Sequence, residues 1–372
     1  MRLDAMELRR VELPLVTPFR TSFGTQTVRT ALIVRAITDV GDGWGECVAE
    51  VEPLYSSEFL DAAELVICDH LVPRLFNAGD ALTAATVAGL LAAVKGHPMA
   101  KAALEMAALD AELRAEGVSF ATRLGAVRSE VDCGVSVGIT STISALVDLV
   151  GRYIDEGYRR IKLKIEPGWD IEPVAAVRAR IGSLPLQVDA NTAYTVADAD
   201  HLARLDDFDL LLIEQPLPED DLRGHAEVAK RVRTPICLDE SIISARSAIE
   251  AIELGACSIV NIKAGRVGGY LEAVRVHDVC AARGVRVWCG GMLETGLGRA
   301  ANLALAALPN FALPGDTSAS ARYWVHDLTD DFVLIDGRLR VPDGPGLGVA
   351  PLPDRLSEMT TNVSTLRRDA RE

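Results

Sequence analysis

Short apolar runs alternate with helix-like segments through the middle of the chain. The runs cover residues 131–138, 160–165, 185–190, 210–216, 234–240, 257–263, 285–290 and 310–316. Between them, apolar residues recur at helical spacing and many segments end in glycine. Buried strands that alternate with helices predict parallel β/α units, and eight units in succession predict an α/β fold with a closed (β/α)8 (TIM-like) barrel. The alternative is an open doubly wound sheet, but VGITST at 137–142 does not resemble its glycine-rich dinucleotide loop.

The flanking regions follow a different pattern. Residues 6–20 and 28–50 predict antiparallel strands, and 61–76, 83–94 and 98–117 predict helices. We therefore expect an α+β capping domain over 1–127 and a barrel with the metal site over 128–320. After residue 321, short strands and turns predict a C-terminal segment, 321–372, that returns to the capping domain. The polar tail from about Asp354 is expected to fray.

Composition narrows the functional classes. The chain has 372 residues and a formal net charge of −15, which argues against nucleic-acid and anionic membrane partners. No apolar run reaches the roughly 18 residues of a spanning helix. The charged N-terminus does not resemble a signal peptide, and seven cysteines without a CxxC pair predict reduced thiols in a cytoplasmic protein.

Ionisable residues mark the ends of five consecutive predicted strands. They are Lys164, Asp189, Glu214, Asp239 and Lys263, spaced 25, 25, 25 and 24 residues apart. Because each interval is one β/α unit, all five are expected at the carboxyl-terminal edge of the barrel, where barrel enzymes carry their active sites.

The three central residues of this series are carboxylates. Without a cation between them, they would repel one another and take up protons. Oxygen ligands suit Mg²⁺ first and Mn²⁺ second, whereas zinc favours histidine or cysteine. The alternative is that each carboxylate caps a helix or forms a salt bridge.

The lysines of the series lie on the second and sixth strands, which face each other across an eight-stranded barrel. Lys162 and Lys164 share one face of their strand, opposite the apolar Ile161 and Leu163, so both are expected to point inward. A substrate carboxylate would then have one lysine on each side of its α-carbon, and either lysine could move the α-proton.

These residues lie in motifs that resemble the muconate-lactonizing-enzyme subgroup of the enolase superfamily. The motifs are KLK at 162–164, VDAN at 188–191, IEQP at 213–216, LDES at 238–241 and NIKAGRVGG at 261–269. The sequences WGECVAE at 44–50, PLYSSE at 53–58, the glycine-rich segment at 289–309 and LPGDTSAS at 313–320 are similar, more narrowly, to the o-succinylbenzoate synthase / N-acylamino acid racemase family.

The resemblance implies a role for each matching position. Asp189, Glu214 and Asp239 match metal ligands; Lys164 and Lys263 match the acid/base pair; Lys162 matches a supporting positive charge; Asn191 and Glu240 match neighbouring positions; Arg266 is associated with racemase ability; and Phe19, Phe23, Tyr55, Gly291 and Met292 are candidate substrate contacts. From Arg266 we further expect a lowered pKa at Lys263, because one cation disfavours another.

The implied chemistry is Mg²⁺-dependent removal of a proton α to a carboxylate, through a metal-stabilised enediolate. It leads to dehydration to o-succinylbenzoate in menaquinone biosynthesis, racemisation of N-succinylamino acids, or both. We also expect a small-molecule carboxylate substrate and a homo-oligomer.

Other activities remain alternatives. A cycloisomerase or a dipeptide epimerase belongs to the same subgroup, although the epimerases usually carry Asp-x-Asp near the eighth strand and this chain has only Asp316 there. A Schiff-base aldolase would leave the three carboxylates unexplained. A binding protein without activity would leave the complete lysine and carboxylate set unexplained.

Overall fold

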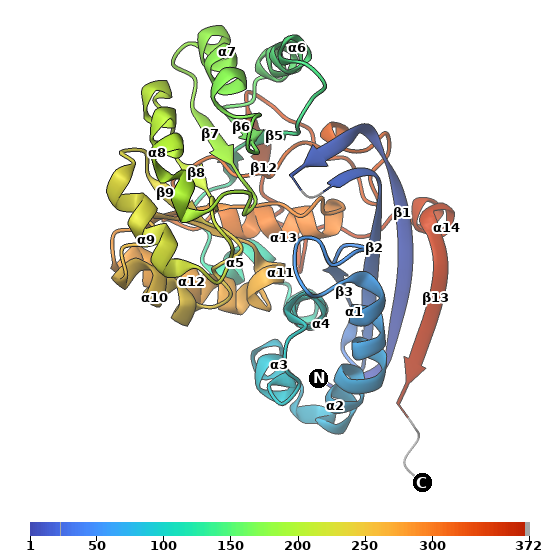
Figure 1. The fold of residues 1–372 in the computed structure, drawn as a ribbon. Helices are drawn as coiled ribbons and strands as arrows, with labels where there is room; N and C mark the ends of the chain where they lie inside the picture. The colour runs from blue at the N-terminus through green and yellow to red at the C-terminus, as the bar shows by residue number, and fades with distance from the viewer. Residues whose placement is uncertain (23, 369–372) are drawn as a thin grey trace.

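Two units make up the computed structural model, which describes residues 1–22 and 24–368. One is a curled parallel sheet of seven strands with helices outside it, and the other is an antiparallel sheet of four strands with its own helices (Figure 1). None of the helices in these described ranges has the length and apolarity needed to span a membrane.

The parallel sheet has the strand order β11-β10-β9-β8-β7-β6-β5. Its strands are β5 (Gly134–Val137), β6 (Arg160–Lys164), β7 (Leu186–Asp189), β8 (Ile213–Glu214), β9 (Ile236–Leu238), β10 (Ile259–Ile262) and β11 (Arg286–Cys289). The helices of this unit are α6 (Ile143–Asp155), α7 (Ile171–Ile181), α8 (Ala199–Leu202), α9 (Leu222–Arg231), α10 (Ala245–Glu253), α11 (Ala264–Val267), α12 (Tyr270–Ala282) and α13 (Gly296–Ala306). Each of the first seven predicted runs contains one strand of this sheet, so the predicted α/β fold with parallel units is confirmed.

The eighth run, 310–316, contributes no strand to this sheet in the described part of the chain. It nevertheless bonds to both edges: Ala312 N donates to Val287 O at 3.1 Å, and Gly134 N donates to Gly315 O at 2.7 Å. Pro314 lies between these contacts and has no N–H to donate, which interrupts a regular ladder.

The antiparallel sheet has the order β13-β1-β2-β3. Its strands are β1 (Leu3–Thr21), β2 (Gly24–Thr38), β3 (Gly41–Cys47) and β13 (Thr360–Arg367), and the helices beside it are α1 (Leu60–Val66), α2 (Val72–Asn77), α3 (Ala84–Leu91), α4 (Pro98–Glu116) and α5 (Phe120–Leu124). Short π and 3₁₀ segments are η1 (Ile67–Leu71), η2 (Gly79–Ala81), η3 (Val196–Asp198), η4 (Ala203–Phe208) and η5 (Ser320–Arg322).

Helix α4 packs directly on β3 because two glycines permit the approach. A Cβ at Gly43 would lie 2.1 Å from Ala107 O, and one at Gly45 would lie 2.1 Å from Ala103 O. Any larger residue would therefore clash with the helix backbone.

The C-terminal region differs from the prediction in two ways. Residues 338–340 form β12 (Arg338–Arg340), which pairs with β4 (Glu130–Asp132) and not with the antiparallel sheet, although the segment already contacts that sheet at Tyr323, whose carbonyl oxygen accepts from Val16 N of β1 at 2.9 Å. The expected fraying from Asp354 is wrong over the described residues: α14 (Pro353–Met359) precedes β13, which pairs along β1. Polar side chains do not prevent this order, because the backbone hydrogen bonds to the edge of β1 hold the strand.

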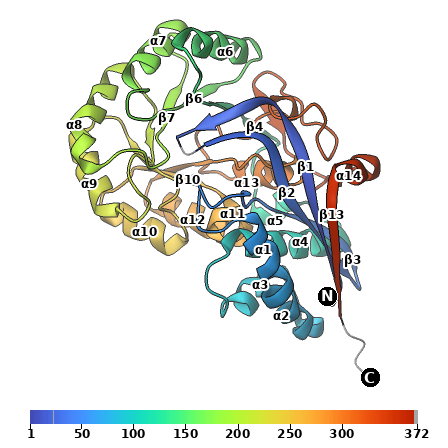
Figure 2. The same ribbon diagram turned by 45° about the vertical axis from the view of Figure 1, so that its right-hand side comes forward.

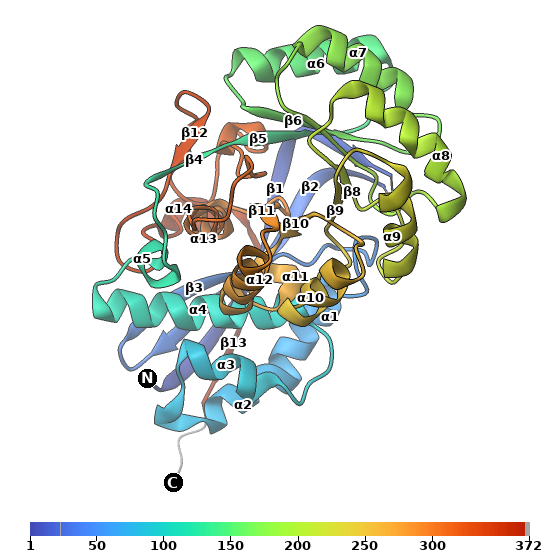
Figure 3. The same ribbon diagram turned by 90° about the vertical axis from the view of Figure 1, so that its left-hand side faces the viewer.

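The β1–β2 hairpin reaches over the carboxyl-terminal edge of the parallel sheet (Figure 2). Ile139 N donates to Arg20 O at 3.0 Å, and the Arg20 guanidinium lies 3.2 Å from the Glu166 carboxylate. On the other side of the molecule, α4 lies beside α11 and α12 (Figure 3), where Leu271 N donates to Glu105 Oε1 at 3.0 Å. The antiparallel unit therefore contacts the parallel unit at several places, of which these are two.

Candidate active site

Strand register places the predicted ionisable residues at one edge of the parallel sheet. Lys164 is the Cα partner of Asp189, and Asp189 is the Cα partner of Glu214. Asp239 follows β9 directly, and Lys263 follows β10 directly. All five side chains are buried, as the spacing of one β/α unit implied.

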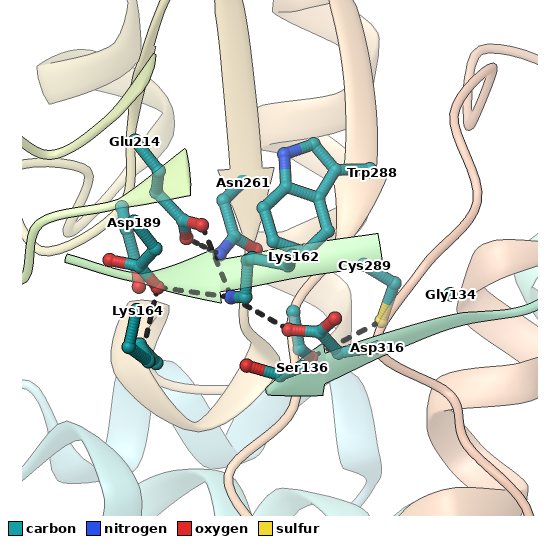
Figure 4. A network of polar contacts seen from close by, with 12 residues as sticks. Gly134, Ser136, Lys162, Lys164, Asp189, Glu214, Asn261, Trp288, Cys289 and Asp316 are labelled. Atoms are coloured by element: carbon teal, nitrogen blue, oxygen red, sulfur yellow. Dashed lines mark hydrogen bonds and ion pairs between the residues drawn. The ribbon is translucent and has the colours of Figure 1, made fainter. Parts of the chain in front are cut away.

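Lys162 lies at the centre of a buried network (Figure 4). Its Nζ is 3.0 Å from Asp189 Oδ2, 3.1 Å from Glu214 Oε2 and 2.8 Å from Asp316 Oδ2. Burial lowers the pKa of Lys162, but the three carboxylates outweigh burial and raise it. The Trp288 ring, 4.8 Å from Nζ, adds a cation–π contact. Lys162 is therefore a fixed positive charge.

Asp316 and Arg160 are functional-site neighbours that we did not predict. Arg160 Nη1 donates to Asp316 Oδ1 at 2.8 Å, while Lys162 approaches the other oxygen. Burial raises the pKa of Asp316, but its two cationic partners outweigh this and lower it. The sequence carried a signal for both: Arg160 is two residues before Lys162 on the same strand face, and Asp316 ends the eighth apolar run.

Lys164 begins a chain of hydrogen bonds. Its Nζ donates to Asp189 Oδ2 at 2.7 Å and to Asn191 Oδ1 at 2.6 Å. Asn191 Nδ2 donates in turn to Glu240 Oε1 at 3.1 Å, and Glu240 Oε2 is buried without a partner among the described residues. Asn191 holds this position with a left-handed backbone, φ 41°, a conformation that asparagine tolerates.

Lys263 contacts both units of the protein. Its Nζ is 2.7 Å from Asp239 Oδ2, although not in hydrogen-bond geometry, and donates to Tyr55 Oη at 3.2 Å. Tyr55 Oη also donates to Asp239 Oδ1 at 3.2 Å. Burial lowers the pKa of Lys263, but Tyr55 and the buried acidic residues raise it overall, which differs from the lowered pKa expected from the sequence.

Arg266 acts on a different partner from the one we expected. Its guanidinium pairs with Asp239 and donates to the carbonyl oxygens of Ile242 and Asn261, at 2.7 and 2.6 Å. It therefore contacts the carboxylate that Lys263 approaches, and any influence on Lys263 passes through Asp239.

Two amides hold the carboxylates in place, and sequence reasoning assigned them no role. Gln215 Oε1 accepts from Asp239 N at 2.9 Å, which ties the IEQP motif to the LDES motif. Asn261 Nδ2 donates to Glu214 Oε1 at 2.7 Å. Gln215 directly follows Glu214, and Asn261 lies two residues before Lys263. This closeness to a predicted site residue was the only sequence signal for either amide.

The carboxylates offer the donor atoms that a hard divalent cation prefers. Burial and the neighbouring Asp189 charge raise the pKa of Glu214 to about 7. Asp239 Oδ2 is buried and accepts no hydrogen bond from a described residue. Within residues 1–22 and 24–368, no three His, Cys, Asp or Glu side chains are grouped as a ready metal site. Three features nevertheless fit a cation such as Mg²⁺. Asp189, Glu214 and Asp239 offer only oxygen atoms, one oxygen of Asp239 has no described partner, and the raised pKa of Glu214 shows a site that favours added positive charge.

A cavity of about 370 Å³ opens above these residues. It is lined by Lys162, Lys164, Lys263, Asn191 and Asp316, together with the candidate substrate contacts Phe19, Tyr55, Gly291 and Met292. Asp189, Glu214 and Asp239 lie behind the lysines and do not line it. Phe23, the remaining candidate contact, lies outside the described residues.

Comparisons with known proteins agree with this arrangement. Residues 145–355 match the "Enolase C-terminal domain-like" family, and residues 5–125 match the "Mandelate racemase / muconate lactonizing enzyme, N-terminal domain" family. The resemblance inferred from the motifs is therefore confirmed.

Curated relatives match over nearly the whole chain. A protein from Amycolatopsis sp named N-succinylamino acid racemase is 68% identical, over 97% of this chain and 98% of its own length. A protein from Geobacillus kaustophilus named o-succinylbenzoate synthase is 47% identical, over 94% and 93%. A solved member of the enolase superfamily from Listeria innocua superposes with a TM-score of 0.95 at 39% identity, covering 99% of this chain and 100% of that one.

Proposed function

Because the chain belongs to the mandelate racemase / muconate lactonizing enzyme family of the enolase superfamily, we propose that it removes and returns protons α to a carboxylate. The reactions are the racemisation of N-succinylamino acids, the dehydration that yields o-succinylbenzoate, or both. The observation that carries the proposal is that Lys164 and Lys263, on strands four steps apart, line one cavity beside three buried carboxylates.

In racemisation, one lysine takes the α-proton while the other, protonated, donates a proton from the opposite face. In dehydration, Lys164 takes the α-proton and, now protonated, gives a proton to the β-hydroxyl, which leaves as water as the C–O bond breaks. The permanent positive charge of Lys162 lies close to the place where negative charge would develop.

Asp189, Glu214 and Asp239 would hold Mg²⁺, and Mn²⁺ would substitute for it. When bound, the cation supplies electrostatic stabilisation for the negative charge that develops on the substrate carboxylate. Asn191, Glu240 and Arg266 keep these carboxylates and lysines in position through the bonds described above.

We further propose that residues 310–316 act as the eighth strand that closes a (β/α)8 barrel. The bonds from this segment to Val287 and Gly134 support closure, since these residues lie on the two edge strands. In this assignment, residues 1–127 and the C-terminal strand form the cap, and 128–320 form the barrel. The seven unpaired cysteines support a cytoplasmic location, in which the dehydration would serve menaquinone biosynthesis.

A dipeptide epimerase is the second candidate, and the structure argues against it. Asp316, the one aspartate of the expected Asp-x-Asp pair, is buried between Arg160 and Lys162. It is therefore not free to bind a substrate ammonium group, and position 318 is serine.

The decisive test is a side-by-side assay of the dehydration substrate and a panel of N-succinyl- and N-acetylamino acids. The purified protein is assayed in excess chelator and after addition of Mg²⁺ or Mn²⁺. We expect activity to disappear with the chelator and to return with either ion. Full activity in excess chelator would contradict the metal assignment, and no α-proton exchange with any substrate in Mg²⁺ would contradict the function.

A further inference from the structure

Arg29 of β2 is a buried cation in the part of the cavity wall that comes from the antiparallel unit. Its exposed fraction is 2%, and it lines the same cavity as Lys162, Lys164 and Lys263. It lies on the core-facing side of β2, where the following residues Ala31 and Ile33 are apolar and fully buried.

This guanidinium has fewer partners than its chemistry requires. Among the described residues, no carboxylate lies within 4.0 Å of it, and its one hydrogen bond runs from Nη2 to Val48 O at 2.8 Å. Its Nε is buried and has no partner in the part of the chain that the structure describes. The nearby buried carboxylate of Glu46 accepts instead from Thr295 and Gly298. Since an unpaired buried charge is costly, Arg29 is suited to an anion that enters with the substrate.

The rest of the cavity suggests which anion this is. The catalytic lysines provide one cationic region, and apolar side chains, including Phe19, Leu54 and Met292, provide a wall suited to a carbon chain. Two acidic residues, Glu50 and Glu52, also line the cavity. Glu50 is half-buried and Glu52 is exposed, so water solvates both carboxylates. The cavity thus matches a substrate with one carboxylate at the reacting carbon and a second carboxylate on a short apolar arm.

We propose that Arg29 is a specificity-determining residue that binds the second carboxylate of the substrate, the terminal carboxylate of the succinyl arm. The inference rests on the proposed function and adds a residue to it. The planar guanidinium offers parallel N–H donors that fit a carboxylate, and such charge-assisted bonds exceed neutral ones in strength. The preference for succinyl over neutral acyl groups would therefore originate in the antiparallel unit and not in the lysine and carboxylate set.

The test compares two substrates that differ only at this carboxylate: the N-succinyl derivative of one amino acid, and the same compound with a terminal amide. Racemisation is followed for wild type, Arg29→Met and Arg29→Lys in Mg²⁺. We expect wild type to prefer the carboxylate, and Arg29→Met to reduce the kcat/KM ratio of the two substrates by about 10-fold or more. Arg29→Lys should restore much of the ratio. Arg35→Met, on the same strand but paired with Asp42, should leave it unchanged.

The outcomes separate this proposal from the proposed function. If wild type turns over both substrates but the ratio does not change in Arg29→Met, the role of Arg29 is overturned while the function stands. If wild type racemises neither compound, the racemase part of the proposed function fails and the role of Arg29 fails with it, while dehydration is judged by its own assay. A second measurement needs no variant: N-succinylglycine should inhibit wild type at least about 10-fold more strongly than its terminal amide, and equal inhibition would also overturn the proposal.

Discussion

The two sides of the cavity hold their lysines in different ways. On one side, the hydrogen bonds and ion pairs of Lys162 and Lys164 with described residues go to side chains of the parallel unit, and Lys162 has three carboxylate partners. On the other side, Lys263 contacts Asp239 but also donates to Tyr55, which comes from the antiparallel unit. The ring of Tyr55 lies 4.4 Å from the Lys263 ammonium and adds a cation–π contact.

This difference has a functional consequence. The first side is complete once the parallel sheet has folded. The second side is complete only when the segment that carries Tyr55 is seated, so it is the side on which the position of the antiparallel unit affects proton transfer. Proton transfer by the two lysines can therefore be perturbed separately.

The largest effect should come from removing one lysine at a time. Lys263→Ala should retain α-proton exchange in heavy water for one enantiomer and lose it by about 10²- to 10⁴-fold for the other. Lys164→Ala should show the opposite preference and should also abolish dehydration. Exchange is followed by NMR with each pure enantiomer. Comparable exchange of both enantiomers by either variant would show that the lysines do not act on opposite faces.

The site was predictable from the sequence where strand periodicity decides the outcome. The spacing of 25 residues placed Lys164, Asp189 and Glu214 at one level, and the period of two placed Lys162 and Lys164 on one face. The candidate cap contacts Phe19 and Tyr55 also line the cavity. The predictions from spacing depend only on the geometry of strands, whereas Phe19 and Tyr55 were implied by the resemblance to the family.

Contacts between distant segments were not predictable in the same way. The Arg160–Asp316 ion pair joins residues 156 positions apart, and Arg266 reaches Asp239 where we expected an effect on Lys263 directly. The order of β13 was missed because it depends on backbone pairing with β1, which polar side chains do not reveal. Side-chain type identifies chemistry, but the choice among several available partners requires the packed structure.

Asp316→Asn tests the side of the cavity that the parallel unit builds alone. The variant removes the charge shared by Arg160 and Lys162 inside the protein, and we expect it to lower the free energy of unfolding by about 3 kcal/mol. Urea unfolding measures the change. Asp132→Asn is the matched control, because it breaks a half-exposed ion pair with Arg338 and should cost less than about 1 kcal/mol. Equal losses would show that the buried network adds no special stability.

Tyr55→Phe tests the side that depends on both units. It removes the hydroxyl that meets Lys263 and Asp239 but keeps the ring. Loss of one hydrogen bond to a charged group predicts about a 10-fold fall in kcat/KM, concentrated in exchange of the enantiomer that Lys263 serves. Isotope exchange with each enantiomer measures the split. An equal fall for both enantiomers would mean that Tyr55 acts on the whole cavity and not on Lys263.

The smallest effect concerns the junction that holds the two units together. Glu46 of β3 accepts from Thr295 N at 2.9 Å and from Gly298 N at 3.0 Å, at the start of α13. Burial raises the pKa of Glu46 from its ordinary 4.5 to about 7. Between these values the folded protein holds a proton that the unfolded chain has released, so folding is favoured at low pH. This contribution is complete below pH 4.5 and is lost as the pH rises through about 7.

Glu46→Gln should therefore flatten the fall in unfolding free energy between pH 5.5 and 7, by at most about 1.4 kcal/mol per pH unit. The measurement is urea unfolding at several pH values, with wild type and variant side by side. Glu227→Gln serves as the control, because the pKa of this exposed residue is lowered by its hydrogen bond with Lys230 and it does not titrate in this range. Glu46 joins the antiparallel unit to α13, and α13 directly follows residues 291–293, which line the cavity. Glu46→Gln should therefore also change KM more than kcat. A pH dependence identical to that of wild type would place the titration elsewhere and leave Glu46 as an uncharged or permanently ionised cap of α13.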